Sequence, residues 1–201
     1  MFRLSEHVKA CKSNNQFDND VCCKLIQILA NDTLPYLKVS DYNTTGLVDN
    51  AISKVVYSIG MGKDADDKGA GGSFGCGHYS YIGLSPIRSF LISSYDKKKK
   101  WSFSGLTSLR SHTYNNQALS SYGYYTSSSN GSAIVCKEEI PTIFRRNESE
   151  GFGTDLFVLG YTRSREHIND LIYATLANYW YAIYLGKLTF EIEDGKNLVY
   201  P

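Results

Sequence analysis

A glycine-rich segment constrains what this chain can fold into more than any other feature of its sequence. Five glycines fall within nine residues, at positions 69, 71, 72, 75 and 77, so the backbone can turn freely and bring its N–H groups close to an anion. The segment follows a predicted strand over 36–40, which ends in Asp41 and a tight polar turn over 43–46. A carboxylate that can accept from an exocyclic amine, followed by a glycine-rich cradle for phosphate, suggests a nucleotide site.

Two other phosphate-binding motifs are absent from the sequence. It contains no GxxxxGK[ST], which excludes a P-loop protein. The glycines at 72, 75 and 77 do not form GxGxxG, and no strand–turn–helix of the dinucleotide-binding type follows them. A glycine-rich loop on its own is more often an ordinary flexible loop than a phosphate site.

Length, charge and cysteine content narrow the class of protein. The chain has 201 residues, enough for one domain with a real core. Its net charge of +1 gives no electrostatic reason to expect nucleic acid as a partner. It contains no apolar run of the roughly 20 residues that a membrane span needs, and no apolar signal-peptide segment at residues 1–15. Five cysteines without a CxxC indicate reduced thiols in a cytoplasmic protein and no zinc site.

Hydrophobic periodicity and turn residues predict an alternation of helices and strands. We expect helices near 5–11, 21–30 (with Asp20 as N-cap), 48–59 and 166–184. Strands are expected over 36–40, 87–94, 101–109, 132–136, 154–161 and 188–193, with a solvated lysine turn at 97–100 and an exposed loop over 113–131. The segment 60–78, with few apolar anchors, is expected to be the most mobile part. Strands joined by hairpins and covered by helices give an α+β sandwich.

Four segments between residues 34 and 193 share an order and spacing with a known family. They read SDYNTTGL, GGSFGCG, GTDLFVLGY and AIYLGKL. Together they resemble the GHKL ATPases, the superfamily of DNA gyrase B, MutL, histidine kinases and a heat-shock chaperone, and more narrowly a bacterial subgroup with SDxNTTGL and GGSFGxGK. Residues 41–47 are similar to the DxGxG box with one extra residue before the second glycine. Residues 68–77 resemble the ATP lid, and Gly153-Thr154-Asp155 resembles the late GT element behind the adenine.

The resemblance implies a fold, cofactors and partners. The fold is the Bergerat type, a two-layer α+β sandwich with a mixed, mostly antiparallel sheet and helices on one face. The cofactors are ATP and Mg²⁺, and ATP or ADP is the small-molecule partner. Lid closure over the nucleotide would drive formation of a homodimer in the full-length protein.

Four residues are candidates for binding the adenine. The base needs one strong acceptor for its N6 amine and an apolar slot. The resemblance assigns the acceptor to Asp41, and an aspartate that merely caps the turn is the alternative. Asn43 lies in the same box, and Gly46 would let the backbone approach the base. Thr154 would hold the same acid or a water beside it, with a plain strand threonine as the alternative.

The phosphates would be held by the glycine-rich segment. Its candidate residues are Gly71, Gly72, Ser73, Phe74, Gly75, Cys76, Gly77 and His78. His78 stands where the subgroup has lysine, and because histidine is mostly neutral near pH 7 it is expected to hold the γ-phosphate weakly. Lys63 and Lys68 could add charge, with solvated lysines as the alternative.

The catalytic helix of the family is not recognisable in this sequence. That helix carries a glutamate base and, four residues later, an asparagine that binds magnesium. No ExxxN precedes Asp41, and Glu6 is followed four residues later by Ala10. The string DNAI at 49–52 imitates part of the box but follows Asp41, so we treat it as a decoy. We therefore expect one ATP-binding domain over 1–201 that lacks the catalytic helix and the transducer domain.

Three functional hypotheses remain open. The chain could be the ATP-binding domain of an ATPase whose lid closure drives dimerisation. It could be a nucleotide-binding remnant that no longer hydrolyses ATP, because a hydrolytic domain needs a positioned base. It could also be a protein-interaction module that keeps only the fold. Fold analogy does not choose among phage defence, DNA repair and chaperoning as the biological process.

Overall fold

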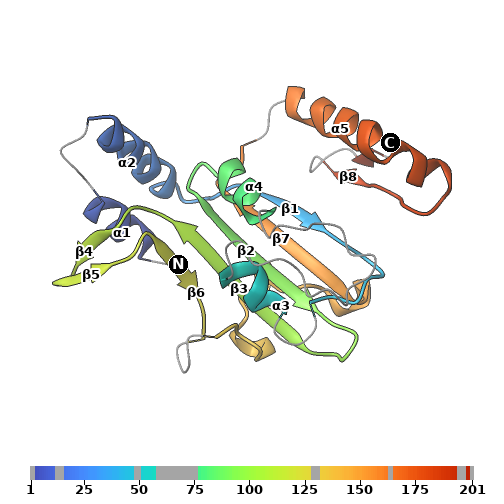
Figure 1. Cartoon of the computed structure of the whole chain (residues 1–201), viewed down its shortest axis with the longest axis horizontal. Coiled ribbons are helices and arrows are strands. Elements are labelled where there is room, and N and C mark those ends of the chain that lie inside the picture. Colours follow the sequence, from blue (N-terminus) through green and yellow to red (C-terminus); the bar gives the residue numbers. More distant parts are fainter. Residues whose placement is uncertain are drawn as a thin grey trace. The chain divides into compact units, whose positions relative to one another are not determined.

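Five antiparallel strands build the main sheet of the protein (Figure 1). In spatial order they are β1 (Tyr36–Ser40), β7 (Gly153–Leu159), β2 (Ser89–Tyr95), β3 (Trp101–Ser108) and β6 (Tyr122–Tyr125). The end of β1 meets the start of β7, where Ser40 pairs with Asp155. The end of β2 lies at the same end of the sheet, where Ser94 pairs with Thr154. The sheet thus gathers the expected Asp41 and GT segments at one end.

The computed structural model divides into two units, Met1–Tyr161 and Thr162–Pro201. The first unit holds the main sheet and all the candidate site residues predicted from the sequence. The residues that the structure describes are 3–11, 16–47, 51–57, 77–127, 132–162, 165–193 and 198–199.

Both faces of the sheet carry apolar side chains, because successive strand residues point to opposite faces. On one face, Phe90 and Ile92 pack in a cluster with residues of helices α3 (Ala51–Tyr57) and α4 (Gly77–Leu84). On the other face, Leu91 packs in a second cluster with residues of helices α1 (Leu4–Ala10) and α2 (Gln16–Leu29). The expected α+β class with a mostly antiparallel sheet is confirmed. The prediction that helices cover only one face of the sheet was wrong, because both faces are apolar and both need to be covered.

Short 3₁₀ turns and a small hairpin complete the first unit. The 3₁₀ turns are η1 (Lys137–Glu139), η2 (Thr142–Phe144) and η3 (Glu148–Glu150), and the hairpin consists of β4 (His112–Tyr114) and β5 (Gln117–Leu119). Asn115 and Asn116 connect the hairpin with φ angles of 48° and 60°, which suits a two-residue turn with left-handed residues. The predicted loop over 113–131 was therefore wrong for the part that forms β5 and β6.

Other predicted boundaries shift in the structure. Helix α2 begins at Gln16, so Asp20 lies inside the helix and is not its N-cap. The predicted strand over 132–136 is reduced to one bridge between Ile134 and Phe103. The lysine turn after Asp96 is exposed, as predicted.

The second unit contains one long helix and a short hairpin. Helix α5 spans Arg165–Tyr184, in good agreement with the prediction over 166–184. Strand β8 (Ile192–Glu193) pairs with β9 (Leu198–Val199), so only the end of the predicted strand over 188–193 forms. The rings of Tyr179 and Phe190 lie 5.3 Å apart within this unit. None of the helices in the described ranges combines the length and apolar character that a membrane crossing requires.

We expect Phe103→Ala to lower the free energy of unfolding by about 3–5 kcal/mol. Phe103 is fully buried in the interior strand β3, and its ring packs against Phe144 and Tyr125. Urea denaturation followed by circular dichroism measures the loss. Val135→Ala is the control, because Val135 is 69% exposed and should change stability by less than about 0.5 kcal/mol. Equal losses in the two variants would contradict this description of the core.

Candidate functional site

Asp41 continues the hydrogen bonding between β1 and β7 by one residue, through its backbone amide and its carboxylate. The Asp41 amide donates to the carbonyl of Thr154 at 3.0 Å, and the Thr154 amide donates to Asp41 Oδ1 at 2.7 Å. The Thr44 hydroxyl donates to the same Oδ1 at 2.8 Å. No residue within the described ranges donates a hydrogen bond to Oδ2. Asp41 is exposed, so its second carboxylate oxygen is available to a ligand.

The glycine before Thr154 is required by the close approach of the Asp41 turn. A Cβ atom at Gly153 would lie 2.2 Å from the Asp41 carbonyl oxygen and 2.7 Å from Oδ1. No side chain fits at these distances. The Gly153-Thr154 pair thus lies directly beside Asp41, as the sequence predicted, although the two segments are more than 100 positions apart.

The turn after Asp41 rests on the connection between β2 and β3. Gly46 has a φ of 65°, and a Cβ there would lie 2.7 Å from the Tyr95 carbonyl oxygen and 2.8 Å from Asp96 Cα. The Lys97 amide donates to the Thr45 carbonyl at 3.1 Å. The sequence interpretation gave Gly46 a close approach to a base. In the structure its closest approach is to the protein backbone, which is a sufficient reason for a glycine.

Ser94 is a site residue that the sequence interpretation missed. Its Oγ accepts a hydrogen bond from the Leu47 amide at 2.8 Å and donates to the Gly153 carbonyl at 3.0 Å. The same Oγ lies 3.3 Å from Thr154 Oγ1. Ser94 therefore ties the Asp41 turn to the start of β7. A serine within a predicted strand carries no sequence signal for such a role.

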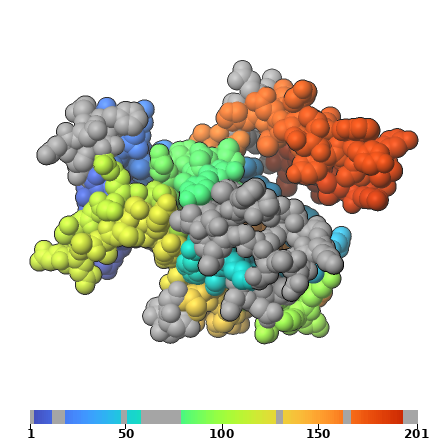
Figure 2. Space-filling model, viewed as in Figure 1, coloured from blue at the N-terminus to red at the C-terminus, as the bar shows by residue number. Residues whose placement is uncertain are grey.

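A cluster of buried apolar side chains adjoins these polar groups on the same face of the sheet. Ile92 and Leu156 lie two residues along from Ser94 and Thr154, so their side chains share that face. Both belong to the cluster that includes Ile82 of α4. Figure 2 shows α3 (cyan) and α4 (green) at the molecular surface. A polar end next to an apolar cluster is the usual composition of a small-molecule site.

Arg146 is buried beneath the Asp41 turn, and it was also missed. Its guanidinium donates from Nη1 to Asp155 Oδ1 at 2.7 Å, from Nη2 to the Asp41 carbonyl at 2.8 Å and from Nε to the Gly151 carbonyl at 3.0 Å. The side chains of Arg146 and Asp155 are fully buried. Asp155 Oδ2 makes an ionic contact with Lys38 Nζ at 3.4 Å. The fork of the guanidinium, which can donate in several fixed directions, explains why arginine suits this place.

Tyr42 covers the outer side of this ion pair. Its ring centroid lies 4.8 Å from Arg146 Cζ, a cation–π contact. Tyr42 itself is 48% exposed. Asn43, next in the turn, is exposed and has a φ of 58°. It lies at the surface of the site, and we assign it no contact among the residues that the structure describes.

The phosphate candidates fall mostly outside the described residues. Those outside are Gly71, Gly72, Ser73, Phe74, Gly75 and Cys76. Gly77 and His78 form the first turn of helix α4.

Glu6 has a structural partner far from Asp41 along the sheet. Its carboxylate accepts a hydrogen bond from the Tyr114 hydroxyl of β4, and this interaction raises the pKa of Tyr114. Val8 of the same helix belongs to the cluster on the face opposite to α3 and α4. Helix α1 therefore does not bring Glu6 to the face that carries Ser94 and Thr154.

We expect Arg146→Met to lower the free energy of unfolding by about 3–5 kcal/mol, because it leaves Asp155 buried without its main partner. Chemical denaturation measures this loss. Lys137→Met is the matched control: Lys137 pairs with Glu148 at the surface, and an exposed pair contributes about 1 kcal/mol or less. A loss for Arg146→Met no larger than for the control would show that the buried pair does not support the fold.

Comparisons with known proteins found no counterpart: no family model matches the chain, and neither a curated protein nor a solved structure matches it. The residues around Asp41 are therefore the basis for assigning a function.

Proposed function

We propose that this chain binds an adenine nucleotide, with Asp41 as the acceptor for the exocyclic amine of the base. The observation that carries the proposal is that the two carboxylate oxygens of Asp41 have different hydrogen-bonding surroundings. Oδ1 accepts from Thr154 and Thr44, which fixes the orientation of the carboxylate. Oδ2 is then presented at an exposed position as a charged acceptor. A fixed acceptor of this kind loses little entropy when it binds an amine.

The neighbouring groups suit an adenine ring. The Thr154 hydroxyl, 3.3 Å from the buried Ser94 Oγ, lies beside the carboxylate and can hold a water that bridges to a ring nitrogen. The apolar cluster around Ile92 and Leu156 adjoins them. The site therefore places one charged acceptor and the Thr154 hydroxyl next to an apolar part of the core, a combination that suits a purine.

The order of segments along the chain supports a binding site for the phosphates at the start of helix α4. The glycine-rich segment leads directly into α4, which begins at Gly77. Backbone N–H groups at a helix N-terminus bind phosphate favourably. Closure of the segment 60–78 over the nucleotide, and dimerisation driven by it, belong to the same proposal.

Hydrolysis receives less support than binding. Helices α3 and α4 contain no acidic residue, and the acids of α1 and α2 are Glu6, Asp18 and Asp20. Glu6 is bonded to Tyr114, and both helices contribute to the cluster on the opposite face. Within the described ranges no group of three His, Cys, Asp or Glu side chains could hold a metal, so Mg²⁺ would arrive with the phosphates of the nucleotide. We therefore favour binding without turnover.

We expect Asp41→Asn to weaken ATP and ADP binding by about tenfold or more. The amide oxygen can still accept from Thr154 and Thr44, so the fold is retained. The amide NH₂ then replaces Oδ2 and opposes the amine of adenine. Because NH₂ donates, the variant should bind ITP, whose base carries an oxygen at that position, better than the unaltered protein does. Titration calorimetry with ATP, ADP and ITP measures all three affinities.

Asp32→Asn provides the control, since Asp32 is an exposed acid in the turn before β1 and loses the same charge. Its ATP affinity should equal that of the unaltered protein. Equal ATP affinity in Asp41→Asn and the control would exclude Asp41 as the base acceptor. If the unaltered protein binds no adenine nucleotide, the chain is better explained as an interaction module.

We expect no ATP hydrolysis above background by this chain at saturating ATP and Mg²⁺. A missing general base typically costs about 10²–10⁴ in rate. A coupled steady-state assay checks this, with Asp41→Asn as the negative control. Robust turnover that Asp41→Asn abolishes would show that an acid outside helices α1 to α4 acts as the base.

A further inference from the structure

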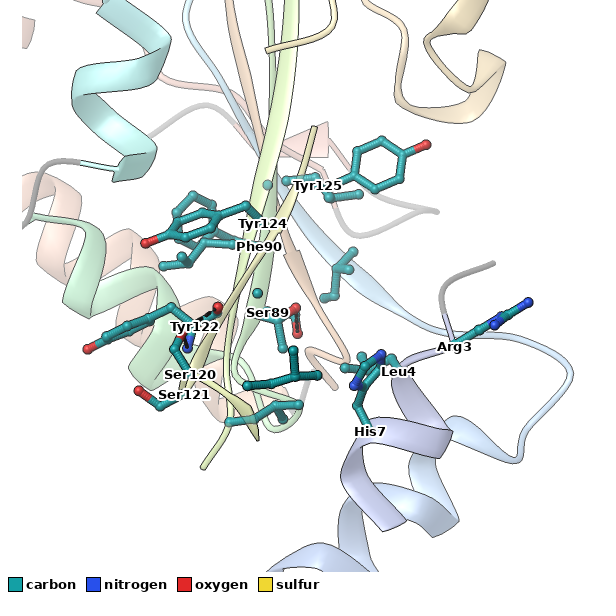
Figure 3. A pocket seen from close by; sticks show the side chains of 18 of the residues that line it. Arg3, Leu4, His7, Ser89, Phe90, Ser120, Ser121, Tyr122, Tyr124 and Tyr125 are labelled. Carbon is teal, nitrogen blue, oxygen red and sulfur yellow. Dashed lines mark hydrogen bonds between the residues drawn. The ribbon is translucent and has the colours of Figure 1, made fainter. Parts of the chain in front are cut away.

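A cavity of about 410 Å³ lies at the end of the sheet opposite to Asp41 (Figure 3). Its floor consists of small residues on three neighbouring strands. Ser89 of β2 pairs with Thr107 of β3, which pairs with Gly123 of β6. Gly105, one step along the same face, pairs with Leu91. Because these side chains are small, they leave a space between the strands and helix α1.

The cavity lies on one face of the sheet. Figure 3 shows the side chains of Phe90, Tyr122 and Tyr124 on one side of the strands and those of Leu4 and His7 on the other. These three aromatic residues also line the cavity, and each is a sequence neighbour of a small floor residue. Strand alternation turns their side chains away from α1, so it is their backbone that forms part of the floor.

Much of the wall is apolar, hydroxyl groups lie along the floor and before β6, and the histidines lie at α1 and β4. The apolar wall residues are Leu4, Leu91, Leu109, Leu119 and Leu159. The volume falls within the range of about 300–1,000 Å³ that small-molecule sites have. His7 and Arg3 of the α1 end and His112 of β4 line the same space. An apolar chamber with two imidazole groups at one end suits an apolar molecule with one acidic group.

A chain of hydrogen bonds fixes the orientation of His7. His112 Nδ1 lies 2.8 Å from the Arg110 carbonyl oxygen, which can only accept, so this nitrogen carries the hydrogen. With both rings neutral, His112 Nε2 is then an acceptor, and His7 Nδ1, 2.9 Å away, donates to it. The remaining nitrogen, His7 Nε2, is therefore an acceptor. It can take a proton without breaking the bond to His112.

We propose that this cavity binds a small apolar molecule that carries one carboxylic acid group. The ligand enters as a carboxylate, a proton from the solvent binds to His7 Nε2, and the carboxylate pairs with the resulting imidazolium ring, which keeps its hydrogen bond to His112. The hydrocarbon part of the ligand lies along the floor of β2, β3 and β6 and is covered by α1. This site is independent of the nucleotide proposal, because it uses the opposite end of the sheet.

Decanoic acid and decanol are a matched pair of probes for this site, measured by titration calorimetry. The unaltered protein should bind the acid at least about tenfold more tightly than the alcohol, because hydrogen bonds to charged groups are stronger than neutral ones. His7→Phe keeps a ring against Tyr114, whose centroid lies 4.5 Å from that of His7, but removes the acceptor. It should bind acid and alcohol equally.

Gly123→Leu tests whether the cavity itself is the site. A Cβ atom at Gly123 meets no atom within 4 Å, so a leucine can enter the cavity without displacing the backbone. This variant should lose both probes while its melting temperature stays the same or rises. Gly83→Leu is the control, since Gly83 in α4 has equally open surroundings and does not line the cavity; it should bind as the unaltered protein does.

Three results would overturn the proposal. The first is undetectable binding of decanoic acid by the unaltered protein. The second is equal binding of acid and alcohol, which would exclude an acidic ligand. The third is unchanged binding in Gly123→Leu, which would place the probe on another surface.

Discussion

The buried ion pair of Arg146 and Asp155 is the interaction on which the Asp41 site depends. A single guanidinium joins three separate parts of the chain: the Asp41 carbonyl after β1, the Gly151 carbonyl before β7, and a carboxylate within β7. Removing Arg146 would leave the buried Asp155 carboxylate with only the longer contact to Lys38, and removing Asp155 would leave the buried guanidinium without a carboxylate. The network therefore fixes the Asp41 turn against β7 through groups that a ligand would never touch. The orientation of the Asp41 carboxylate is a second consequence, since the backbone that carries it cannot shift.

The same sheet presents different environments at its two ends. Near Asp41, the strands end in serine, threonine and glycine residues that bond to one another and to the turn after β1. At the other end, small residues under α1 leave an open chamber. Between the two ends, Phe90 and Phe157 lie in the apolar clusters on opposite faces. The middle of the sheet thus supplies stability, and its ends are free to carry binding groups.

The sequence predicted the parts of the fold that depend on local patterns. The strands around β2, β3 and β7, the long helix α5 and the approach of Gly153-Thr154 to Asp41 follow from periodicity, turn residues and the family resemblance. Arg146 could not be found in this way, because Arg145 and Arg146 are adjacent and chemically equal, and only tertiary packing decides which one is buried.

Two further differences have similar causes. The strands of the β4–β5 hairpin are only three residues each, HTY and QAL, which is too short for a periodic pattern, and the paired asparagines in its turn are the only local signal for it. The placement of helices on both faces depends on which side of α1 and α2 meets the sheet. Helical periodicity marks an apolar side of a helix but does not say which face of a sheet it covers.

Asp41 Oδ1 accepts two hydrogen bonds, and this has a consequence for how the protein can change over evolution. Asp41 serves the pairing of β1 with β7 through one oxygen, and in our proposal the other oxygen accepts from a ligand. Natural selection for folding alone would therefore retain a residue with a short side chain and an acceptor at this position, even in a lineage that no longer binds the ligand. Aspartate and asparagine are equivalent for folding, whereas only aspartate presents a second acceptor. Lineages in which asparagine replaces this aspartate would thus mark the loss of binding, while the persistence of aspartate records selection on the outward-facing oxygen.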